Sequence, residues 1–489
     1  EFIVFLEGGL SIMKYFIKSI FIFTIFVIVS TKQIYAQVTQ EWVKRFSLQT
    51  DAGDTAYSIA VDGSGYVYVA GIVWRNEDDA SFSYLYDYGT IKYEPDGDYY
   101  WTGQTAPGHR LYNNSPTDDG IDAAYSIVVD GSGNIYVTGR SYGSTSTSFD
   151  YATVKYNSTG EKQWASRYNG PESSDDVAVS VVLDGSGNVY VTGRSIDKNY
   201  DIATVKYNSS GTQQWVARYN GSGDDDDAAE SMVIDGSANI YVTGYCTGSS
   251  TGKDYVIIKY NSSGTQQWVA TYNGVGSGED IAHTIKVDGS GNVYVTGRSK
   301  QYASTDFAYA TVKYNSSGTQ QWAAIYNANG YDWDEAYSLA VDGSGNVFVT
   351  GKSEGPASFT STYFDYATIK YNSSGSQQWE ARYNGPGSDN DEAYALVIDG
   401  SSNVYITGRS KGNGTDFDYA TIKYNSSGTQ QWIARYDNDY NDEAYAITIH
   451  NSGNVYVTGG SYETGIEFDW ATIKYSQNGD FIPQTPVTH

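Results

Sequence analysis

AYSLAVDGSGNVFVTGKSEGPASFTSTYFDYATIKYNSSGSQQWEARYNG, residues 336–385, is a run of residues that recurs with small changes along most of the chain. It contains four short segments rich in β-branched and aromatic residues, namely AYSLAVD, NVFVTG, YATIKY and QQWEARY. Gly, Asn, Asp and Ser separate them, which predicts four strands, A to D in chain order, joined by turns. Both faces of each strand carry small or apolar side chains, which is typical of a sheet covered on both sides. A repeat of about 50 residues with these properties predicts one blade of a β-propeller.

Three markers of the repeat each occur eight times. The A–B turn begins at Asp62, Asp130, Asp184, Asp235, Asp288, Asp342 and Asp399, and at His450 in the eighth unit. Strand C carries Lys92, Lys155, Lys206, Lys259, Lys313, Lys370, Lys423 and Lys474. Strand D carries Trp42, Trp101, Trp164, Trp215, Trp268, Trp322, Trp379 and Trp432. The count predicts an all-β protein with a single eight-bladed propeller of four-stranded blades, with seven blades as the alternative.

The order of the strands predicts how the ring closes. A D segment at Glu41–Phe46 precedes every A segment, and the last unit stops after its C segment at Trp470–Tyr475. We expect the N-terminal strand to complete the last blade, because closure removes exposed sheet edges.

The two ends of the chain differ in composition from the repeats of the propeller. Residues 13–36 begin with Met13, continue with lysines and an apolar run, and end with Ala36, which predicts a secretory signal peptide cleaved near that residue. An uncleaved membrane anchor is the alternative. Residues 1–12 are interpreted as upstream translation, 37–475 as the propeller and 476–489 as a Pro-containing linker or tail. Cys246 is the single cysteine of the 489 residues, and we place it in a B–C loop.

The net charge of −27 comes largely from two sets of acidic residues. One set precedes the strands A: Asp118, Asp119, Asp122, Asp175, Asp176, Asp224 to Asp227, Glu279, Asp280, Asp332, Asp334, Glu335, Asp389, Asp391, Glu392, Asp439, Asp442 and Glu443. The other precedes the strands C: Asp87, Asp150, Asp201, Asp254, Asp365, Asp418 and Asp469. Both sets map to the face that carries the variable B–C and D–A connections, which predicts an acidic face that repels nucleic acid and anionic lipid. The alternative is solvation together with Asp side chains that accept backbone N–H bonds in turns.

Two groups of candidate site residues stand out. Asp224, Asp225, Asp226 and Asp227 are denser than a turn requires, and hard cations bind several carboxylate oxygens at once, so they suggest a Ca²⁺ site. Trp74 and Trp333 each stand in a variable loop, and with Asp118, Asp119, Asp334 and Glu335 they suggest a ligand-binding surface, since amphipathic rings suit sugars and interfaces. Loop packing and turn formation are the alternatives.

The repeated turn DGSGN also invites a calcium interpretation. It lacks the glycine position and the distal bidentate Glu of a calcium loop of the helix–loop–helix type. We interpret it as a hairpin turn in which Asp caps the backbone and Gly and Asn supply positive φ.

The segments DGSGNVYVTG (184–193), DYATIKYNSSG (418–428) and QQWVARY (213–219) resemble the SBBP family of bacterial β-propeller repeats. The resemblance extends over about Glu41 to Tyr475. It implies an exported bacterial propeller, often part of a cell-surface protein. It implies little about activity, because the family is largely uncharacterised in function.

These patterns lead to a prediction of function with alternatives. The sequence shows no nucleophile or phosphate-loop motif, and His109, His283, His450 and His489 have no metal-like spacing. We expect an exported, monomeric, non-enzymatic propeller that binds a protein or polysaccharide at the cell surface, without nucleic acid or stable membrane insertion. A secreted hydrolase or lyase that uses loop carboxylates is the first alternative, and a structural spacer is the second. Ca²⁺ is the one cofactor that the residues suggest.

Overall fold

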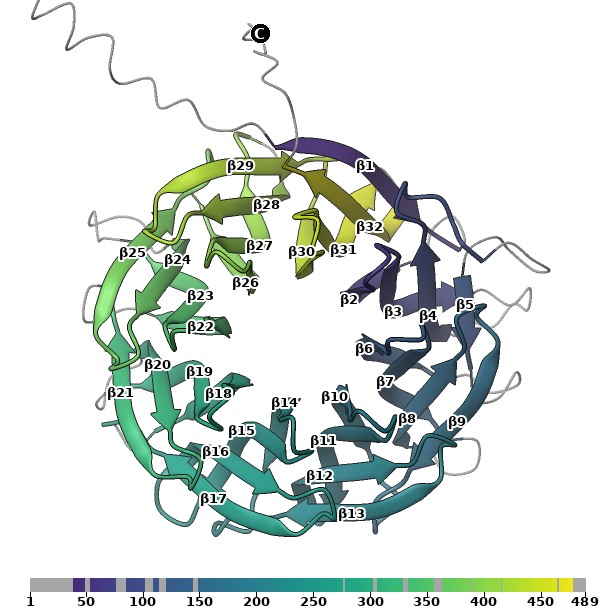
Figure 1. The fold of residues 1–489 in the computed structure, drawn as a ribbon, viewed down its shortest axis with the longest axis vertical. Coiled ribbons are helices and arrows are strands. Elements are labelled where there is room, and N and C mark those ends of the chain that lie inside the picture. Colours follow the sequence, from purple (N-terminus) through teal and green to yellow (C-terminus); the bar gives the residue numbers. More distant parts are fainter. Residues whose placement is uncertain are drawn as a thin grey trace, which may run out of the picture. The chain divides into compact units, whose positions relative to one another are not determined.

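The computed structural model describes residues 38–48, 53–75, 85–101, 109–113, 120–143, 148–275, 278–301, 306–328, 333–355, 363–387, 389–414, 416–463 and 466–477. The segments interpreted as upstream translation (1–12), signal peptide (13–36) and most of the tail (478–489) lie outside them. The described part of Val38–Asp480 forms eight four-stranded sheets arranged as blades around one axis (Figure 1). The prediction of eight blades is confirmed. No helix among the described residues is long and apolar enough to cross a membrane.

In seven of the eight blades the chain runs in order from the inner strand at the axis to the outer strand. The inner strands are β2 (Thr55–Val61), β6 (Ala123–Val129), β10 (Asp176–Leu183), β14 (Ala228–Ile234), β18 (Asp280–Val287), β22 (Asp334–Val341), β26 (Asp391–Ile398) and β30 (Asp442–Ile449). The second strands are β3 (Val67–Arg75), β7 (Ile135–Tyr142), β11 (Val189–Asp197), β15 (Ile240–Gly248), β19 (Val293–Lys300), β23 (Val347–Glu354), β27 (Val404–Lys411) and β31 (Val455–Glu463).

The outer half of each blade holds the predicted strands C and D. The third strands are β4 (Leu85–Tyr93), β8 (Phe149–Tyr156), β12 (Asn199–Tyr207), β16 (Gly252–Tyr260), β20 (Phe307–Tyr314), β24 (Phe364–Tyr371), β28 (Phe417–Tyr424) and β32 (Ile466–Ser476). The outer strands are β5 (His109–Tyr112), β9 (Lys162–Tyr168), β13 (Gln213–Tyr219), β17 (Gln266–Tyr272), β21 (Gln320–Tyr326), β25 (Gln377–Tyr383), β29 (Gln430–Tyr436) and β1 (Thr39–Phe46).

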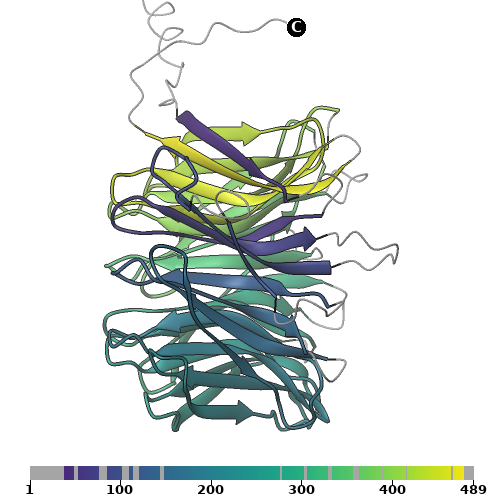
Figure 2. The ribbon, with the colours of Figure 1, turned by 90° about the vertical axis from the view of Figure 1, so that its right-hand side faces the viewer.

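The last blade contains strands from both ends of the propeller. Its strand order is β1-β32-β31-β30, so the N-terminal strand supplies the outer position, as predicted. Figure 2 shows the purple strand β1 beside the yellow C-terminal strands. The remaining seven sheets each use four consecutive strands.

The core lies between neighbouring blades. Successive strand residues point to opposite faces of a sheet, and Val347, Phe348 and Val349 of β23 are all fully buried. Both faces of this strand are therefore covered. Phe348 packs with Leu396 and Tyr424 of the next blade, so each blade shares its apolar residues with its neighbour.

The repeated Trp and Lys residues connect each blade to the next. Trp379 Nε1 and Lys370 Nζ of the sixth blade both donate to the carbonyl of Ser426, at 3.1 and 3.0 Å, in the C–D turn of the seventh blade. In that turn Gly428 has φ of +82°, and a Cβ there would lie 2.7 Å from the Trp379 ring. We call this arrangement the inter-blade clasp. It explains why Trp, Lys and the NSSG turn recur together.

The A–B turn has the predicted carboxylate cap. Asp130 Oδ1 accepts the backbone N–H groups of Ser132 and Asn134, both at 2.9 Å, and Gly133 has φ of +76°. The expectation of positive φ at the Asn was wrong. The Asn134 side chain instead donates a hydrogen bond to Asp130 Oδ2 at 2.8 Å, and this contact between side chains rigidifies the turn.

One aspartate at the start of each inner strand is buried and does not belong to an exposed acidic face, contrary to the prediction, whereas Asp224, Asp225, Glu279 and Asp439 of the same set are exposed. Asp391 is fully buried, and its two oxygens accept the backbone N–H groups of Gly385 at 2.7 Å and Lys411 at 3.0 Å. Asp280 makes the same pair of bonds to Gly274 and Lys300. These carboxyls tie the D–A connection to the end of strand B, because a buried backbone N–H group needs an acceptor.

The buried aspartates predict an unusual dependence of stability on pH. Burial raises the pKa of Asp54 and Asp442 to about 7 and of Asp227 and Asp391 to about 6. An acid whose pKa is raised on folding stabilises the folded state below its unfolded pKa, and that contribution is lost as the pH rises through the folded pKa. We therefore expect the thermal unfolding midpoint to increase when the pH is lowered from 8 to 5, as measured by calorimetry.

Repulsion among the acidic residues behind the net charge of −27 also raises the unfolding midpoint at lower pH, because protonation weakens this repulsion. High salt screens surface repulsion but affects buried groups much less. The increase should therefore persist in high salt, and a midpoint that falls on acidification would contradict the role of these carboxyls.

The first blade departs from the predicted pattern. Its outer strand is β5, which begins at His109 and pairs with β4, whereas Trp101 precedes this strand and belongs to none. Trp101 is still buried, and a Cβ on Gly160 in the next blade would lie 2.7 Å from its ring. The outer position of this blade is thus taken by His109–Tyr112 and not by a strand that contains Trp101.

Cys246 lies in strand β15 and is buried, so its placement in a B–C loop was wrong. It pairs in register with Asp254. Burial raises the pKa of the Cys246 thiol to about 12. The thiol therefore stays protonated and has little nucleophilic character at neutral pH.

Candidate functional site

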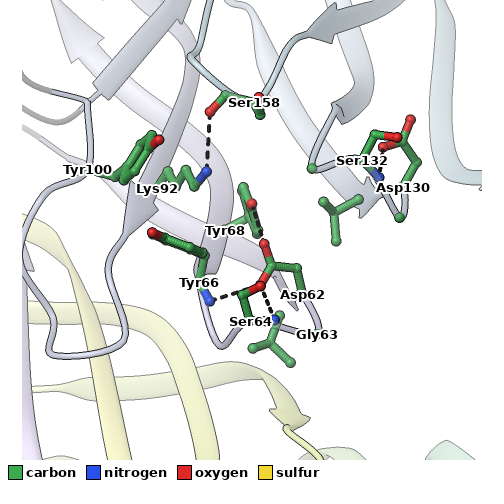
Figure 3. Close-up of a pocket in the computed structure, with 14 residues that line it drawn as sticks. Asp62, Gly63, Ser64, Tyr66, Tyr68, Lys92, Tyr100, Asp130, Ser132 and Ser158 are labelled. Carbon is green, nitrogen blue, oxygen red and sulfur yellow. Dashed lines mark hydrogen bonds between the residues drawn. The ribbon is translucent and has the colours of Figure 1, made fainter.

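The face that carries the A–B and C–D turns has clefts between neighbouring blades. The cleft between blades 1 and 2, with a volume of about 520 Å³, is lined by Asp62, Tyr66, Lys92 and Tyr100 among others (Figure 3). The Lys92 ammonium lies 4.4 Å from the Tyr66 ring centre and 3.9 Å from that of Tyr100. It donates to the Ser158 carbonyl at 3.2 Å, so it is the clasp lysine of this blade.

The same cleft recurs elsewhere on this face. Clefts of about 490 and 380 Å³ lie between blades 4 and 5 and between blades 5 and 6, lined by the corresponding turn residues. A cleft formed at several positions by the same repeated residues is a property of the repeat. It does not define a unique site.

The seven aspartates that precede the strands C are buried, so their predicted place on an exposed face was wrong, and five of them pair with an arginine. Asp150 lies 2.8 Å from Arg167 and Asp201 lies 2.8 Å from Arg218, each arginine being on the outer strand of the same blade. Corresponding pairs join Asp365 with Arg382, Asp418 with Arg435 and Asp469 with Arg45. These carboxylates stabilise the blades by joining the third strand to the outer strand.

Aromatic rings follow one another along the inner strands. Adjacent ring centres are 5.7 Å apart for His283–Tyr337, Tyr337–Tyr394, Tyr394–Tyr445 and Tyr57–Tyr125, and 5.8 Å apart for Tyr57–Tyr445. We call these six residues the inner aromatic arc. They come from six consecutive blades and are partly exposed. Val179 and Glu230 take the corresponding positions in blades 3 and 4.

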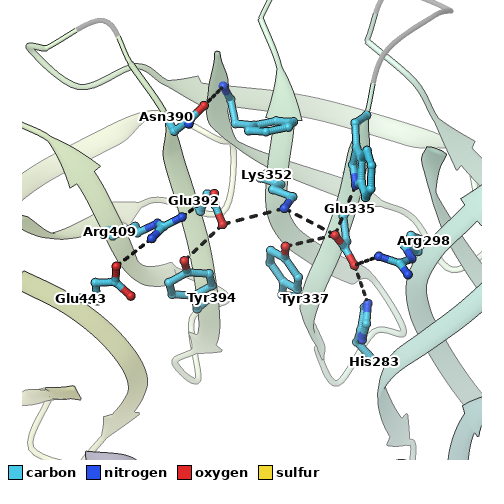
Figure 4. Close-up of polar contacts among 12 residues, drawn as sticks. His283, Arg298, Glu335, Tyr337, Lys352, Asn390, Glu392, Tyr394, Arg409 and Glu443 are labelled. Atoms are coloured by element: carbon cyan, nitrogen blue, oxygen red, sulfur yellow. Dashed lines mark hydrogen bonds and ion pairs between the residues drawn. The ribbon is translucent and has the colours of Figure 1, made fainter. Parts of the chain in front are cut away.

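A network of charged residues lies beside the inner aromatic arc (Figure 4). Glu335 Oε1 accepts from Arg298 at 3.1 Å and lies 2.9 Å from His283 Nε2, and its Oε2 accepts from the Tyr337 hydroxyl at 3.1 Å. Lys352 Nζ is 3.6 Å from the same carboxylate. The partners come from two neighbouring blades, so Glu335 joins the inner ends of blades 5 and 6.

The network continues into blades 7 and 8. Arg409 donates to Glu392 of its own blade at 2.9 Å and to Glu443 of the next blade at 2.7 Å. Tyr394 and Tyr445 donate their hydroxyls to these two carboxylates, at 3.2 and 2.6 Å. Each tyrosine hydroxyl is thus held by the glutamate two residues before it, which fixes the orientation of the ring.

The charges decide the protonation state of the network. Although burial acts to raise the pKa of Glu335, the His283 hydrogen bond and the Arg298 and Lys352 charges lower it to about 2. Glu335 is therefore ionised at neutral pH. An ionised carboxylate with all its neighbours cationic or donating cannot serve as a general acid.

The tryptophans predicted as ligand contacts have different surroundings. Trp333 is 38% exposed, packs on the Phe307 ring at 4.9 Å and donates to Glu335 at 3.4 Å, so it lies at the edge of the network. Trp74 lies in strand β3, not in a loop as predicted, and pairs with Tyr86. The two belong to blades 6 and 1 and do not share a site.

The predicted acidic ligand contacts are likewise divided. Both Glu335 and Asp334 are buried, but they have different roles. Glu335 belongs to the charged network, whereas Asp334 accepts the Ala328 backbone N–H at 3.1 Å. Asp118 and Asp119 lie outside the described residues. Of the four predicted ligand contacts that the structure describes, Glu335 and Trp333 meet in the charged network.

The four consecutive aspartates do not converge on a common point. Asp227 accepts backbone N–H groups from Gly221 and Thr247, and Asp226 accepts one from Tyr200 at 3.1 Å. Asp225 and Asp224 accept from other neighbours, the Asp226 backbone and the Asn220 side chain. Within the described ranges no three Asp, Glu, His or Cys side chains are grouped so that they could hold a metal ion. The geometry does not support the predicted Ca²⁺ site.

The sequence interpretation missed the inner aromatic arc. The signal lies in the alignment of the inner strands, which all have an Asp and, two residues later, an Ala. Two positions vary in this alignment: the first lies between the Asp and the Ala, and the second follows the Ala and supplies the residues of the inner aromatic arc. The first varies from Thr55 to Ala123, Val177, Ala228, Ile281, Glu335, Glu392 and Glu443. Variable positions on a constant scaffold are where binding residues are found.

These observations define the class of the protein: it is an eight-bladed β-propeller with a variable inner ring. The SBBP beta-propeller repeat, as a family model, matches the chain at residues 41–71, 118–144, 163–201 and 321–357. The resemblance predicted from the repeated motifs is confirmed at these four stretches. No match was found among curated proteins.

Solved structures with a similar fold have little sequence in common with this chain. The polysaccharide lyase Uly1 is 11% identical, with a TM-score of 0.44, over 90% of this chain and 100% of that one. The β-propeller domain of the Trilobed protease from Pyrococcus furiosus is 8% identical, with a TM-score of 0.41, over 73% and 96%. The NanB sialidase from Streptococcus pneumoniae is 10% identical, with a TM-score of 0.38, over 88% and 94%.

Proposed function

We propose that the protein is an exported, non-enzymatic binding module whose ligand, a polysaccharide or a protein at the cell surface, docks on the inner aromatic arc. The observation that carries this proposal is the run of six partly exposed rings on neighbouring inner strands. Aromatic rings supply large contact areas at low entropic cost and suit sugars and interfaces. Export is proposed from the N-terminal residues 13–36.

The chemistry of the network supports binding rather than turnover. Carboxylate catalysis requires one carboxyl that is protonated and a second one nearby that is not. Glu335, Glu392 and Glu443 are each held by cationic side chains and a tyrosine hydroxyl. Such carboxylates hold the rings in place.

The proposal is tested by substitution in the inner aromatic arc of the full-length protein. We expect Tyr394→Ala and Tyr57→Ala to weaken binding to a retained polysaccharide or cell-surface protein by at least about tenfold, a difference of about 1.4 kcal/mol. Binding and product release are measured together on a panel of bacterial and plant polysaccharides, with Ca²⁺ and with chelator.

Tyr100→Ala is the matched control, because this partly exposed tyrosine lines the cleft on the opposite face. Equal loss of binding in Tyr100→Ala and Tyr394→Ala would move the site away from the arc. Release of shortened or unsaturated products would show that the protein is an enzyme and not a binding module. If no member of the whole panel is retained, the result would favour the alternative that the propeller is a structural spacer.

A further inference from the structure

The arginine at the end of strand B is repeated in the sequence, but its surroundings differ between blades. Arg140, Arg194, Arg298 and Arg409 take the same place in blades 2, 3, 5 and 7. Arg298 and Arg409 reach glutamates of the next blade, at 3.1 and 2.7 Å. These two guanidinium groups are neutralised within the protein.

Among the described residues no carboxylate pairs with Arg140 in this way. Its cross-strand neighbour is Ala123, and Val177 takes the position that Glu443 occupies next to Arg409. The guanidinium packs on the Phe149 ring at 4.6 Å, and its Nε is buried without a hydrogen-bond partner. Nε is equally unpartnered in Arg298 and Arg409, so what distinguishes Arg140 among the described residues is that no carboxylate lies beside its partly exposed guanidinium group.

Arg194 repeats this situation one blade further. Its cross-strand neighbour is Val177, and Ala228 stands where a partner glutamate would be. It packs on the Tyr200 ring at 4.8 Å, and its Nε is also buried without a partner. Glu230 of the next blade is exposed and within electrostatic reach of Arg194, but forms no ion pair with it.

The protein itself shows what these arginines can hold. Within blade 7 the Glu392 carboxylate accepts from Arg409 at 2.9 Å and from the Tyr394 hydroxyl at 3.2 Å. In blade 2 the equivalent arginine and tyrosine are Arg140 and Tyr125, but Ala123 takes the place of Glu392, so the carboxylate is absent. A ligand carboxylate would restore the arrangement that the other blades build from their own residues.

We propose that Arg140 and Arg194, with the adjoining rings of Tyr125 and Tyr57, bind the carboxylate of a uronic acid within a saccharide. This inference rests on the binding role proposed above and names the class of its ligand. Guanidinium groups recognise carboxylates through paired hydrogen bonds, and rings beside them accept the flat face of a sugar. The net charge of −27 repels densely charged polyanions, so the acidic sugar is an isolated one between neutral sugars.

The test is calorimetric titration of the full-length protein with D-glucuronate, D-glucose and inorganic sulfate. We expect D-glucuronate to bind more tightly than D-glucose, and Arg140→Gln/Arg194→Gln to weaken it by at least tenfold. Glu230→Gln should strengthen it, because the substitution removes a negative charge near Arg194. Since no described carboxylate pairs with either arginine and only the contacts with the Phe149 and Tyr200 rings are lost, the double variant should stay folded, with an unfolding temperature close to that of the wild type.

Lys198→Gln is the control, because it removes one positive charge from an exposed position at the B–C turn of blade 3. Unchanged glucuronate binding in the double variant, or no glucuronate binding at all, would overturn the inference. Sulfate that binds as tightly as glucuronate and competes with it would overturn the assignment of a carboxylate. The Tyr394→Ala assay on polysaccharides decides the proposed function separately, since it does not depend on the charge of the ligand.

Discussion

Replacing Trp42 by alanine is expected to lower the free energy of unfolding by about 3–5 kcal/mol, the usual cost of deleting a large buried aromatic side chain. Trp42 is 9% exposed and packs against Tyr93 and Tyr456, with ring centres 5.8 and 6.1 Å away. Its Nε1 donates to the Pro95 carbonyl at 3.3 Å, and Lys474 donates to the same oxygen at 2.9 Å. These contacts are the inter-blade clasp between the last blade and the first.

Trp379→Ala is the matched substitution within the ring, because Trp379 makes the same clasp to Ser426. We expect a similar loss of stability in both variants by denaturant unfolding. Only Trp42→Ala should also increase hydrogen exchange in β1 and β32, because β1 is held to the ring by this clasp and by its pairing with β32. Equal exchange in the two variants would show that closure does not depend on Trp42.

Arg435→Ala is expected to destabilise the protein by about 3–5 kcal/mol, because it leaves the buried Asp418 carboxylate without a counter-charge. Arg435 donates to Asp418, to the Ser410 hydroxyl at 2.7 Å and to the Tyr383 hydroxyl of the preceding blade at 2.7 Å. Asp418 is 3% exposed. The substitution therefore breaks a pair within one blade and a contact between two.

The pH dependence separates this mechanism from simple loss of packing. Burial raises the pKa of Asp418, and loss of the arginine removes the interactions that oppose this shift. The acid should then be neutral in the folded variant at low pH, so the destabilisation should be smaller at pH 5 than at pH 8. The double variant Arg435→Met/Asp418→Leu should recover much of the loss, and an equal loss at both pH values would contradict a charge-based effect.

Much of the fold could be predicted from the sequence because its markers act locally or between adjacent repeats. Trp379, Lys370 and the turn around Ser426 form one clasp, so each recurs whenever a blade is added. The strand at Glu41–Phe46 was predicted to close the ring because it carries a clasp tryptophan without a preceding blade. The first blade was less predictable, because Trp101 keeps its buried position although the outer strand begins only at His109.

The candidate site could be predicted from the sequence less well than the fold. Asp334 and Glu335 are adjacent acids in the sequence, but one caps a backbone N–H group and the other anchors the charged network. Trp74 looked like a loop residue, whereas register places it in β3. Composition cannot distinguish these roles, because each depends on which face of the strand the side chain takes.

The sequence by itself determined the number of blades, their strand order and the turns that join them, because those depend on residues close together within a repeat. The tertiary structure alone decided which charges are paired. Arg140 and Arg409 each stand in a TGRS segment, yet Arg409 pairs with Glu443 of the next blade, 34 positions away, whereas the repeat position equivalent to Glu443 in the blade after Arg140 is Val177. An ion pair depends on a distance of a few ångströms between side chains of different blades, and the spacing of residues along the chain does not contain that distance.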